Sequence, residues 1–216
     1  MKQGLARILR ENRSTLIFLA LMFVFRSACA DWNHVPSGSM KPTILEGDYI
    51  LVDRMAYDIR VPFTHISLAK VGEPQRGEIV VFDSKASGNR LVKRVVGVPG
   101  DTVALRNNRL VINGQPASYE PASEASHFRD MHEDLPGMEH LVRLHKRGSP
   151  MANFPPVRVP RDSYLVLGDN RDNSADSRVI GLVPRREILG RTRSVLLSLD
   201  YDNYFLPRAN RFLQEL

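Results

Sequence analysis

Residues 90–98 read RLVKRVVGV, and this short β-branched stretch decides the fold class. Valine and leucine dominate it, and β-branched residues pack well on the pleated surface of a sheet. Alternate side chains of a strand point to opposite faces, so Leu91, Lys93 and Val95 are predicted on one face and Arg94 on the other. The stretch therefore predicts a strand that carries a lysine on an apolar face.

Five further stretches have the same character. They are GDYILVD (47–53), GEIVVFD (77–83), TVALRNNRLVING (102–114), SYLVLGD (163–169) and RSVLLSLD (193–200). Their lengths and β-branched content predict strands. Asn107 and Asn108 predict a tight hairpin turn inside the third stretch. The one helix expected outside the N-terminal region is short and runs from near Pro184 to Leu189, because proline is favoured at a helix start. The chain is thus expected to be mainly β.

Ser118 to Pro160 breaks this pattern, because it is polar, charged and poor in recognisable strands. We interpret it as an inserted lobe or a long excursion. It holds four of the six histidines, namely His127, His132, His140 and His145. No pair of them has the spacing that places two metal ligands on one helix face. We therefore expect solvated surface histidines and no metal.

The composition is that of an ordinary globular protein, with 43% apolar and 25% charged residues in 216. Cys29 is the single cysteine, so an intrachain disulfide and a cysteine-rich zinc site are excluded. The formal charge is +6, but acidic residues separate the basic ones, and aromatic residues are not interleaved with them. A nucleic-acid partner is not expected from this pattern, and no cofactor is expected either.

The N-terminal region begins with a basic segment. Lys2, Arg7, Arg10 and Arg13 precede the apolar run STLIFLALMFVF at 14–25. One interpretation is a cleavable signal peptide with Ala28-Cys29-Ala30 as its cleavage site. A second is a retained membrane anchor. A third, a lipid-modified Cys29, is disfavoured because Arg26 stands where an apolar residue is needed.

A retained anchor requires about 20 apolar residues. Thr15 to Val35 supplies that length if Arg26 extends its charge toward the lipid head groups. Trp32 would then lie at the far interface, where its amphipathic ring is favoured. We assign residues 1–13 to a cytoplasmic basic tail and 14–34 to a transmembrane anchor, which places the remainder outside by the positive-inside rule.

The segment HVPSGSMKPT, residues 34–43, follows this anchor closely. Pro36 and Pro42 lack backbone donors, so neither a helix nor a strand is comfortable here. Ser37 and Ser39 are candidate nucleophiles, provided that a base takes the proton and donors stabilise the oxyanion. No Ser/His/Asp order with a recognisable local signature is visible. The residues alone leave the choice between the two serines open.

Histidine would be the obvious base for such a serine, and Lys93 is the other candidate. A lysine on an apolar face is desolvated, so its pKa falls and it can act as a neutral general base. The alternative is a lysine on an edge strand that stays in water. The sequence of the strand leaves both possibilities open.

A third stretch, LGDNRDNSADSRVIGLVP at 167–184, crowds Gly, Asn and Asp between two predicted strands. One interpretation is a solvated turn whose side chains bind their own backbone. The other is a loop that orders its neighbours through ion pairs and through Ser174, which could hydrogen-bond an amine. The residues suited to ion pairs are Arg94, Asp169, Asp176 and Arg178.

Taken together, PSGSMKPT, LVKRVVGVPGD and GDNRDNSADSRVIGLVP, in that order and with GDYILVDR after the first, resemble the membrane-bound type I signal peptidase family. The resemblance implies an antiparallel β-sheet catalytic core with a smaller inserted lobe, preceded by one transmembrane helix. It assigns residues 35–106 and 158–216 to the core and 107–157 to the variable lobe.

The same resemblance implies roles for individual residues. Ser39 would be the nucleophile and Lys93 the general base, and the Ser39 N–H and the Ser37 hydroxyl would form the oxyanion hole. Ser174 would orient the Lys93 amine. The supporting residues would be the Asp176–Arg178 pair, the Asp169–Arg94 pair, and Met40, which would line the turn and the membrane-facing surface.

The implied function is removal of signal peptides from exported preproteins at the outer face of the bacterial cytoplasmic membrane. Substrates with small residues at the cleavage site, the lipid bilayer and the export machinery are the implied partners. This favours a retained single-pass anchor, although self-cleavage after Ala30 stays open. Two alternatives remain: a specialised processing peptidase with a narrow substrate range, and a catalytically inactive anchored binding module. A self-cleaving repressor is excluded because residues 1–35 leave no room for a helix-turn-helix.

Overall fold

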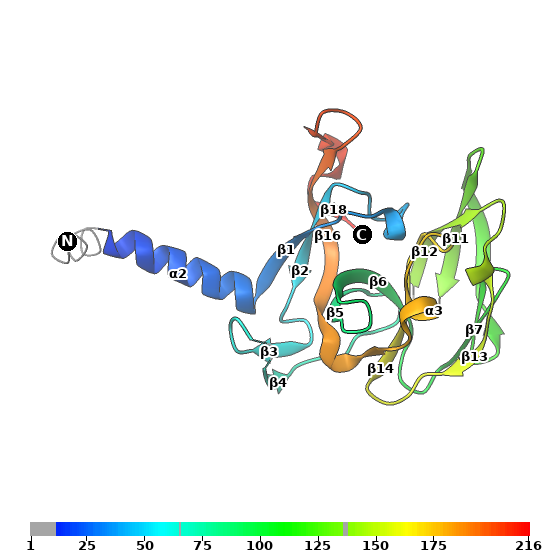
Figure 1. The fold of residues 1–216 in the computed structure, drawn as a ribbon, viewed down its shortest axis with the longest axis horizontal. Helices are drawn as coiled ribbons and strands as arrows, with labels where there is room; N and C mark the ends of the chain where they lie inside the picture. Colours follow the sequence, from blue (N-terminus) through cyan, green and yellow to red (C-terminus); the bar gives the residue numbers. More distant parts are fainter. Residues whose placement is uncertain (1–11, 65, 136–137) are drawn as a thin grey trace.

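The computed structural model describes residues 12–64, 66–135 and 138–216. The predicted basic tail at 1–13, apart from its last two residues, and His65 lie outside the described residues. The chain is mainly β, as predicted, and the strands within its sheets pair antiparallel. One helix projects from the sheets as an arm (Figure 1).

The largest sheet has nine strands and contains most of the predicted apolar stretches. Its order is β1-β2-β16-β5-β6-β14-β15, and β17 and β18 also pair with β16. The bounds are β1 Ala30–His34, β2 Asp48–Asp53, β5 Ile79–Ser84, β6 Asn89–Gly97, β14 Ser163–Leu167, β15 Val183–Pro184, β16 Ile188–Asp200, β17 Leu206–Pro207 and β18 Gln214–Glu215. The strand predicted from RLVKRVVGV is thus confirmed as β6, between β5 and β14.

Three smaller sheets complete the fold. The four-stranded sheet has the order β13 (Phe154–Arg158), β7 (Thr102–Arg106), β8 (Arg109–Ile112), β9 (Gln115–Pro116). The three-stranded sheet has the order β10 (Ser118–Glu124), β11 (Phe128–Leu135), β12 (Met138–His145), and the two-stranded sheet pairs β3 (Asp58–Arg60) with β4 (Ser67–Lys70). The hairpin turn predicted at Asn107 and Asn108 is confirmed, and both residues have positive φ, 49° and 60°.

The expectation that Ser118 to Pro160 is poor in strands is wrong. The strands β10 to β12 fill much of it, with continuous pairing between β11 and β12. They escaped prediction because several buried positions carry charge: Asp130 and Glu133 on β11 are both buried and paired with arginines. The alternation of apolar and polar residues that identifies a half-buried strand is therefore missing from β11.

The division into a core at 35–106 and 158–216 and a lobe at 107–157 stays a prediction. β7 pairs with β8 and β13, so strand pairing favours placing the first boundary at the turn 98–101 and not after 106. A buried apolar cluster also crosses this boundary. It joins Val96 of β6 and Leu165 of β14 to Val103, Leu110 and Leu135 of the smaller sheets. The two parts therefore share a core.

The described residues contain few helices, and α2 is much the longest of them. They are α2 Arg13–Ala28, α3 Ser177–Ile180 and the 3-10 turns η1 Gly38–Met40, η2 Pro150–Ala152, η3 Arg185–Glu187 and η4 Ala209–Arg211. The helix expected from Pro184 to Leu189 is one 3-10 turn with Pro184 at its N-cap. The short helix α3 was not predicted, and it begins where Asp176 accepts a hydrogen bond from the Arg178 N–H.

Helix α2 has 16 residues and none of them is buried. It ends at Ala28, and Ala30–His34 forms β1 paired with β2, so the predicted helical anchor at 14–34 is wrong over its last five residues. Arg26 pairs with Asp31 at 2.8 Å and lies over the Trp32 ring, which fixes the junction between helix and sheet. Among the helices of the described residues, none combines the length and the apolar character needed to cross a membrane.

Candidate active site

Ser39 lies in the 3-10 turn η1, directly after the proline-containing segment that follows β1. The turn is closed by hydrogen bonds from Lys41 N to the Gly38 carbonyl and from Ile44 N to the Met40 carbonyl. Met40 is 1% exposed and packs in an apolar cluster with Val35 and Ile44. Met40 therefore anchors the turn to the core. The prediction that it lines a membrane-facing surface is wrong, because its side chain is buried.

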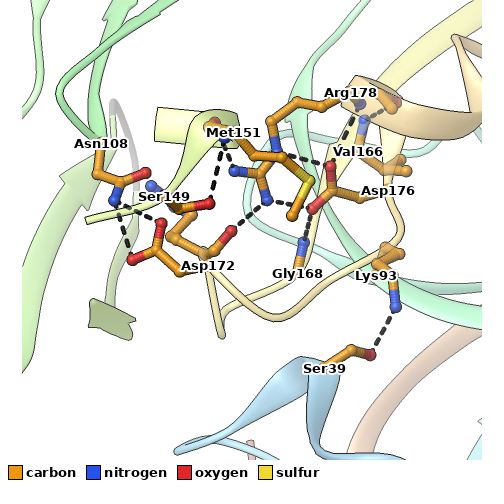
Figure 2. A network of polar contacts seen from close by, with 12 residues as sticks. Ser39, Lys93, Asn108, Ser149, Met151, Val166, Gly168, Asp172, Asp176 and Arg178 are labelled. Atoms are coloured by element: carbon orange, nitrogen blue, oxygen red, sulfur yellow. Dashed lines mark hydrogen bonds and ion pairs between the residues drawn. The ribbon is translucent and has the colours of Figure 1, made fainter. Parts of the chain in front are cut away.

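Lys93 reaches this turn from the middle of β6. Its Nζ donates to Ser39 Oγ at 2.7 Å and to the Val92 carbonyl at 2.9 Å (Figure 2). Lys93 is only 3% exposed, while Ser39 is half-buried and Ser37 is exposed. The alternative of a lysine kept in water thus does not describe this side chain. The structure brings together a hydroxyl and an amine that are 54 residues apart in the chain.

The surroundings of Lys93 shift its amine toward the neutral form. Burial lowers the pKa of Lys93 from its usual 10.5 to about 8, because a charged ammonium loses its hydration there. The carboxylates of Asp176 and Asp169 raise the pKa of Lys93 and only partly offset this effect. About a tenth of the amine is therefore uncharged at pH 7, and about half at pH 8, where it can accept a proton from Ser39.

The loop after β14 is held by Asp176 and Arg178, the pair that the sequence predicted. Asp176 is fully buried and accepts from Gly168 N at 3.0 Å and from the Arg178 guanidinium at 2.7 and 2.8 Å. Arg178 also donates to the carbonyls of Met151 and Arg171. Figure 2 shows this network beside the Lys93–Ser39 contact. The network ties the end of the loop back to its start at Gly168 and Arg171, and to Met151 of η2.

Asp169 and Arg94 form the second predicted pair, and each is 1% exposed. Arg94 binds the carboxylate through two nitrogens at 2.7 and 2.8 Å. Burial would raise the pKa of Asp169, but the Arg94 charge outweighs it and holds that pKa below its usual value. Thr43 donates to the same carboxylate at 2.6 Å. This pair therefore ties the loop both to β6 and to the segment after the Ser39 turn.

Ser174 is buried against Gly168, but its hydroxyl has no hydrogen-bond partner among the described residues. The predicted hydrogen bond between Ser174 and the Lys93 amine is thus not formed in this structure. A buried hydroxyl without a partner is costly, so its position next to the dyad calls for a function.

Gly168 is a site residue that sequence reasoning missed. A Cβ at this position would lie 2.4 Å from the Ser39 carbonyl oxygen and 2.3 Å from Ser174 Oγ. Only a glycine allows the loop backbone to approach the nucleophile turn this closely. The single signal in the sequence was its place at the end of a predicted strand.

Asn170 is the second residue that was missed. Its backbone N–H donates to the Ser39 carbonyl at 3.1 Å, and its side-chain amide donates to the Gly38 carbonyl at 2.9 Å. Two consecutive carbonyls of the nucleophile turn are therefore held by one residue. Nothing in the sequence distinguishes this asparagine from the turn-forming residues around it.

Replacing Gly168 by alanine is expected to lower activity by about 10- to 100-fold, because an added methyl must push the Ser39 turn or Ser174 aside. Cleavage rate and melting temperature of Gly168→Ala should be measured together. The control is Gly88→Ala, where a Cβ would meet nothing within 4 Å and φ is +70°, so this variant carries backbone strain without a steric clash. Equal activity in the two variants at equal folded fraction would contradict the close approach.

The histidines of the lobe differ from one another. His140 is buried, with Nε2 at 3.3 Å from Glu133 and 4.0 Å from Asp169, so the surface interpretation is wrong for this residue. His132 remains on the surface beside Glu139. In the part of the chain that the structure describes, no three His, Cys, Asp or Glu side chains are grouped to hold a metal ion.

Comparisons with known proteins point in one direction. Residues 8–197 match a family model described as signal peptidase, peptidase S26. Signal peptidase I of Pseudomonas aeruginosa is 36% identical over 208 residues, which cover 88% of this chain and 73% of that protein. Signal peptidase I P of Bacillus subtilis subsp. natto is 32% identical over 200 residues, which cover 92% of this chain and 94% of that protein. A crystal structure of a signal peptidase I from Enterococcus faecalis V583 covers 56% of this chain and 98% of that chain at 29% identity, with a TM-score of 0.36.

Proposed function

This chain belongs to the signal peptidase family, peptidase S26, and removes signal peptides as a serine endopeptidase, and we propose that it does so with Ser39 as nucleophile and Lys93 as general base. The observation that carries this assignment is the 2.7 Å contact between Lys93 Nζ and Ser39 Oγ at a site that excludes water from the amine. A Ser/Lys pair is a variant of the catalytic triad in which one amine replaces histidine and aspartate.

The chemistry follows from this geometry. The neutral Lys93 amine takes the proton of the Ser39 hydroxyl as Oγ attacks the scissile carbonyl, and the resulting ammonium gives the proton to the leaving amine. An acyl-enzyme forms in which the signal peptide is the acyl group. Lys93, neutral again, then takes a proton from water as the water oxygen attacks the acyl carbon. The Lys93 ammonium returns that proton to Ser39 Oγ as the bond to Oγ breaks, and the signal peptide leaves with a free carboxyl group.

The developing oxyanion needs donors near Ser39. The Ser39 N–H and the Ser37 hydroxyl are the candidates, and the position of Ser37 directly before the η1 turn supports them. Ser174 would orient the Lys93 amine. Its support is indirect: the hydroxyl is buried next to Gly168, whose backbone packs against the Ser39 carbonyl, and it has no hydrogen-bond partner among the described residues.

The enzyme would act on preproteins with small residues before the cleavage site. The test is incubation with a secreted precursor in detergent, followed by mass measurement of both products. We expect one cut at the end of the signal peptide. Several unrelated precursors should be compared, because cleavage of only one of them would favour a specialised processing peptidase. Failure to cleave any of them would contradict the function.

We also propose a membrane location, in which α2 is part of an anchor with a cytoplasmic N-terminus and the sheets lie on the extracytoplasmic side. The exposed apolar side chains along α2 support it. The hairpin of β3 and β4 supports it independently, because Phe63, Ile66 and Leu68 are exposed on it and Phe63 N donates to Ser27 Oγ near the end of α2. The apolar surface of the arm thus continues onto the sheets, which would hold the active site close to lipid and to export machinery.

A label at position 63 is expected to enter the lipid surface. In a Cys29→Ser background, an environment-sensitive dye on Phe63→Cys should shift its emission to the blue when the protein is reconstituted into phospholipid vesicles. The control is Val179→Cys, also an exposed apolar position but on α3. A dye at position 63 that stays as water-exposed as the one at position 179 would overturn the membrane contact of the hairpin.

A further inference from the structure

The lobe reaches the catalytic loop through backbone hydrogen bonds. The carbonyl of Arg143, on β12, accepts from Arg171 N at 3.0 Å, and the Arg143 N–H donates to the Asp169 carbonyl at 2.8 Å. These two bonds form an isolated parallel bridge between Arg143 and Asn170. Asn170 in turn binds the carbonyls of Gly38 and Ser39. One residue therefore separates a strand of the lobe from the turn that carries the nucleophile.

A buried ion pair reinforces this connection. The guanidinium of Arg171 donates to both carboxylate oxygens of Glu133, on β11. Glu133 is 0% exposed and Arg171 is 1% exposed. The Tyr119 hydroxyl of β10 donates to the same carboxylate, so two strands of the lobe converge on Arg171. Burial would raise the pKa of Glu133, but the charge of Arg171 outweighs it and holds that pKa well below the usual value, so the carboxylate is ionised.

Stability alone is a poor explanation for such a pair. Removing two charges from water is expensive, and apolar side chains of similar volume often stabilise a fold equally well. What the ion pair does supply is direction, because a bidentate arginine allows little rotation. Arg171 is the neighbour of Asn170, so a fixed guanidinium fixes the residue that holds the Ser39 turn.

We propose that Glu133 of the lobe is a positioning residue for the nucleophile, acting through Arg171 and Asn170. The lobe then contributes to catalysis, although its strands supply neither member of the dyad. This inference rests on the proposed role of Ser39 as nucleophile.

The test compares two carboxylates on the same strand. Glu133→Gln removes the charge that holds Arg171. Asp130→Asn removes a similar charge that holds the side chain of Arg143, whose hydrogen bonds to the loop are made by its backbone. We expect Glu133→Gln to lower kcat by about 10- to 100-fold with KM nearly unchanged, because misplacing a reacting group affects the chemical step. Asp130→Asn should keep the wild-type kcat. The acid limb of the pH profile should keep its midpoint in both variants, since Lys93 is untouched.

A double variant separates positioning from stability. Glu133→Met with Arg171→Met replaces the ion pair by apolar side chains and is expected to recover the melting temperature lost in Glu133→Gln, while kcat stays low. Recovery of kcat together with the melting temperature would overturn the proposal, as would equal kcat in Glu133→Gln and Asp130→Asn. Ser39→Ala serves as the reference: if that variant stays active, the dyad assignment fails, whereas an inactive Ser39→Ala beside a fully active Glu133→Gln removes only the role of Glu133.

Discussion

Ser39→Ala is expected to lower kcat/KM for precursor cleavage by roughly 10,000-fold or more, because no other group can form the acyl-enzyme. Lys93→Met should cost about as much, since it keeps the buried aliphatic stem but removes the amine that contacts Ser39 Oγ. Both variants should remain folded. Ser39→Ala removes only a hydroxyl, and the methionine side chain of Lys93→Met suits a site from which water is excluded. The measurements are initial cleavage rates on a purified precursor and thermal unfolding of each variant.

The double variant is the sharper test. Groups that act as one catalytic unit are strongly non-additive, so Ser39→Ala with Lys93→Met should be hardly slower than either single change. Ser37→Ala is the comparison for Ser39→Ala, because it removes a neighbouring hydroxyl that is not the nucleophile from the same segment. It should lose about 100- to 1,000-fold, the usual cost of one oxyanion donor. Wild-type activity in Ser39→Ala or Lys93→Met would remove the dyad assignment.

The strands of the large sheet could be predicted because they are rich in apolar residues. β5 begins with an uninterrupted apolar run that is buried on both faces, and β6 is rich in valine and leucine and is buried from Lys93 to Gly97. The lobe strands could not be predicted in this way. On β11 the buried positions include Asp130 and Glu133, whose partners come from β12 and from the catalytic loop. A hydropathy pattern does not predict the burial of carboxylates that are paired with arginines far away in the sequence.

The candidate site was accessible to different degrees. A lysine within an apolar strand pointed to a depressed pKa, but the contact with Ser39 depends on how β6 meets the η1 turn, and no spacing encodes that. The choice of Ser39 over Ser37 came from the family resemblance. Gly168 and Asn170 were missed because they act through close approach and through backbone carbonyls. Such roles leave no residue pattern.

The end of the N-terminal helix shows the same limit. The length that a spanning helix needs, about 20 residues, suggested that the anchor extends beyond the apolar run at 14–25 to residue 34. Instead Ala30–His34 pairs with β2 in full register, from Ala30 opposite Asp53 to His34 opposite Tyr49. Sheet pairing prevails over helix extension in this segment, and the residues that pair with it lie 15 to 23 positions later in the chain.

The pH profile of cleavage is expected to report the Lys93 amine directly. The base must be neutral, so activity requires a pH near or above the Lys93 pKa of about 8. Below that pH, kcat/KM should fall about tenfold per unit, reaching roughly 1,000-fold at pH 5, because the neutral fraction falls in the same proportion. A rate that stays flat down to pH 5 would contradict an amine base.

Two variants assign this acid limb to Lys93. Asp176→Asn removes a carboxylate that raises the pKa of Lys93, so the midpoint should move to lower pH even if the plateau rate falls through loss of the Arg178 pair. His140→Gln removes the buried histidine near Asp169 and should leave the midpoint in place, since burial lowers the pKa of His140 below its usual value and keeps it neutral over the pH range of the limb near 8. A midpoint that follows His140 and ignores Asp176 would assign the titration to the histidine, and the amine would lose its role as the base.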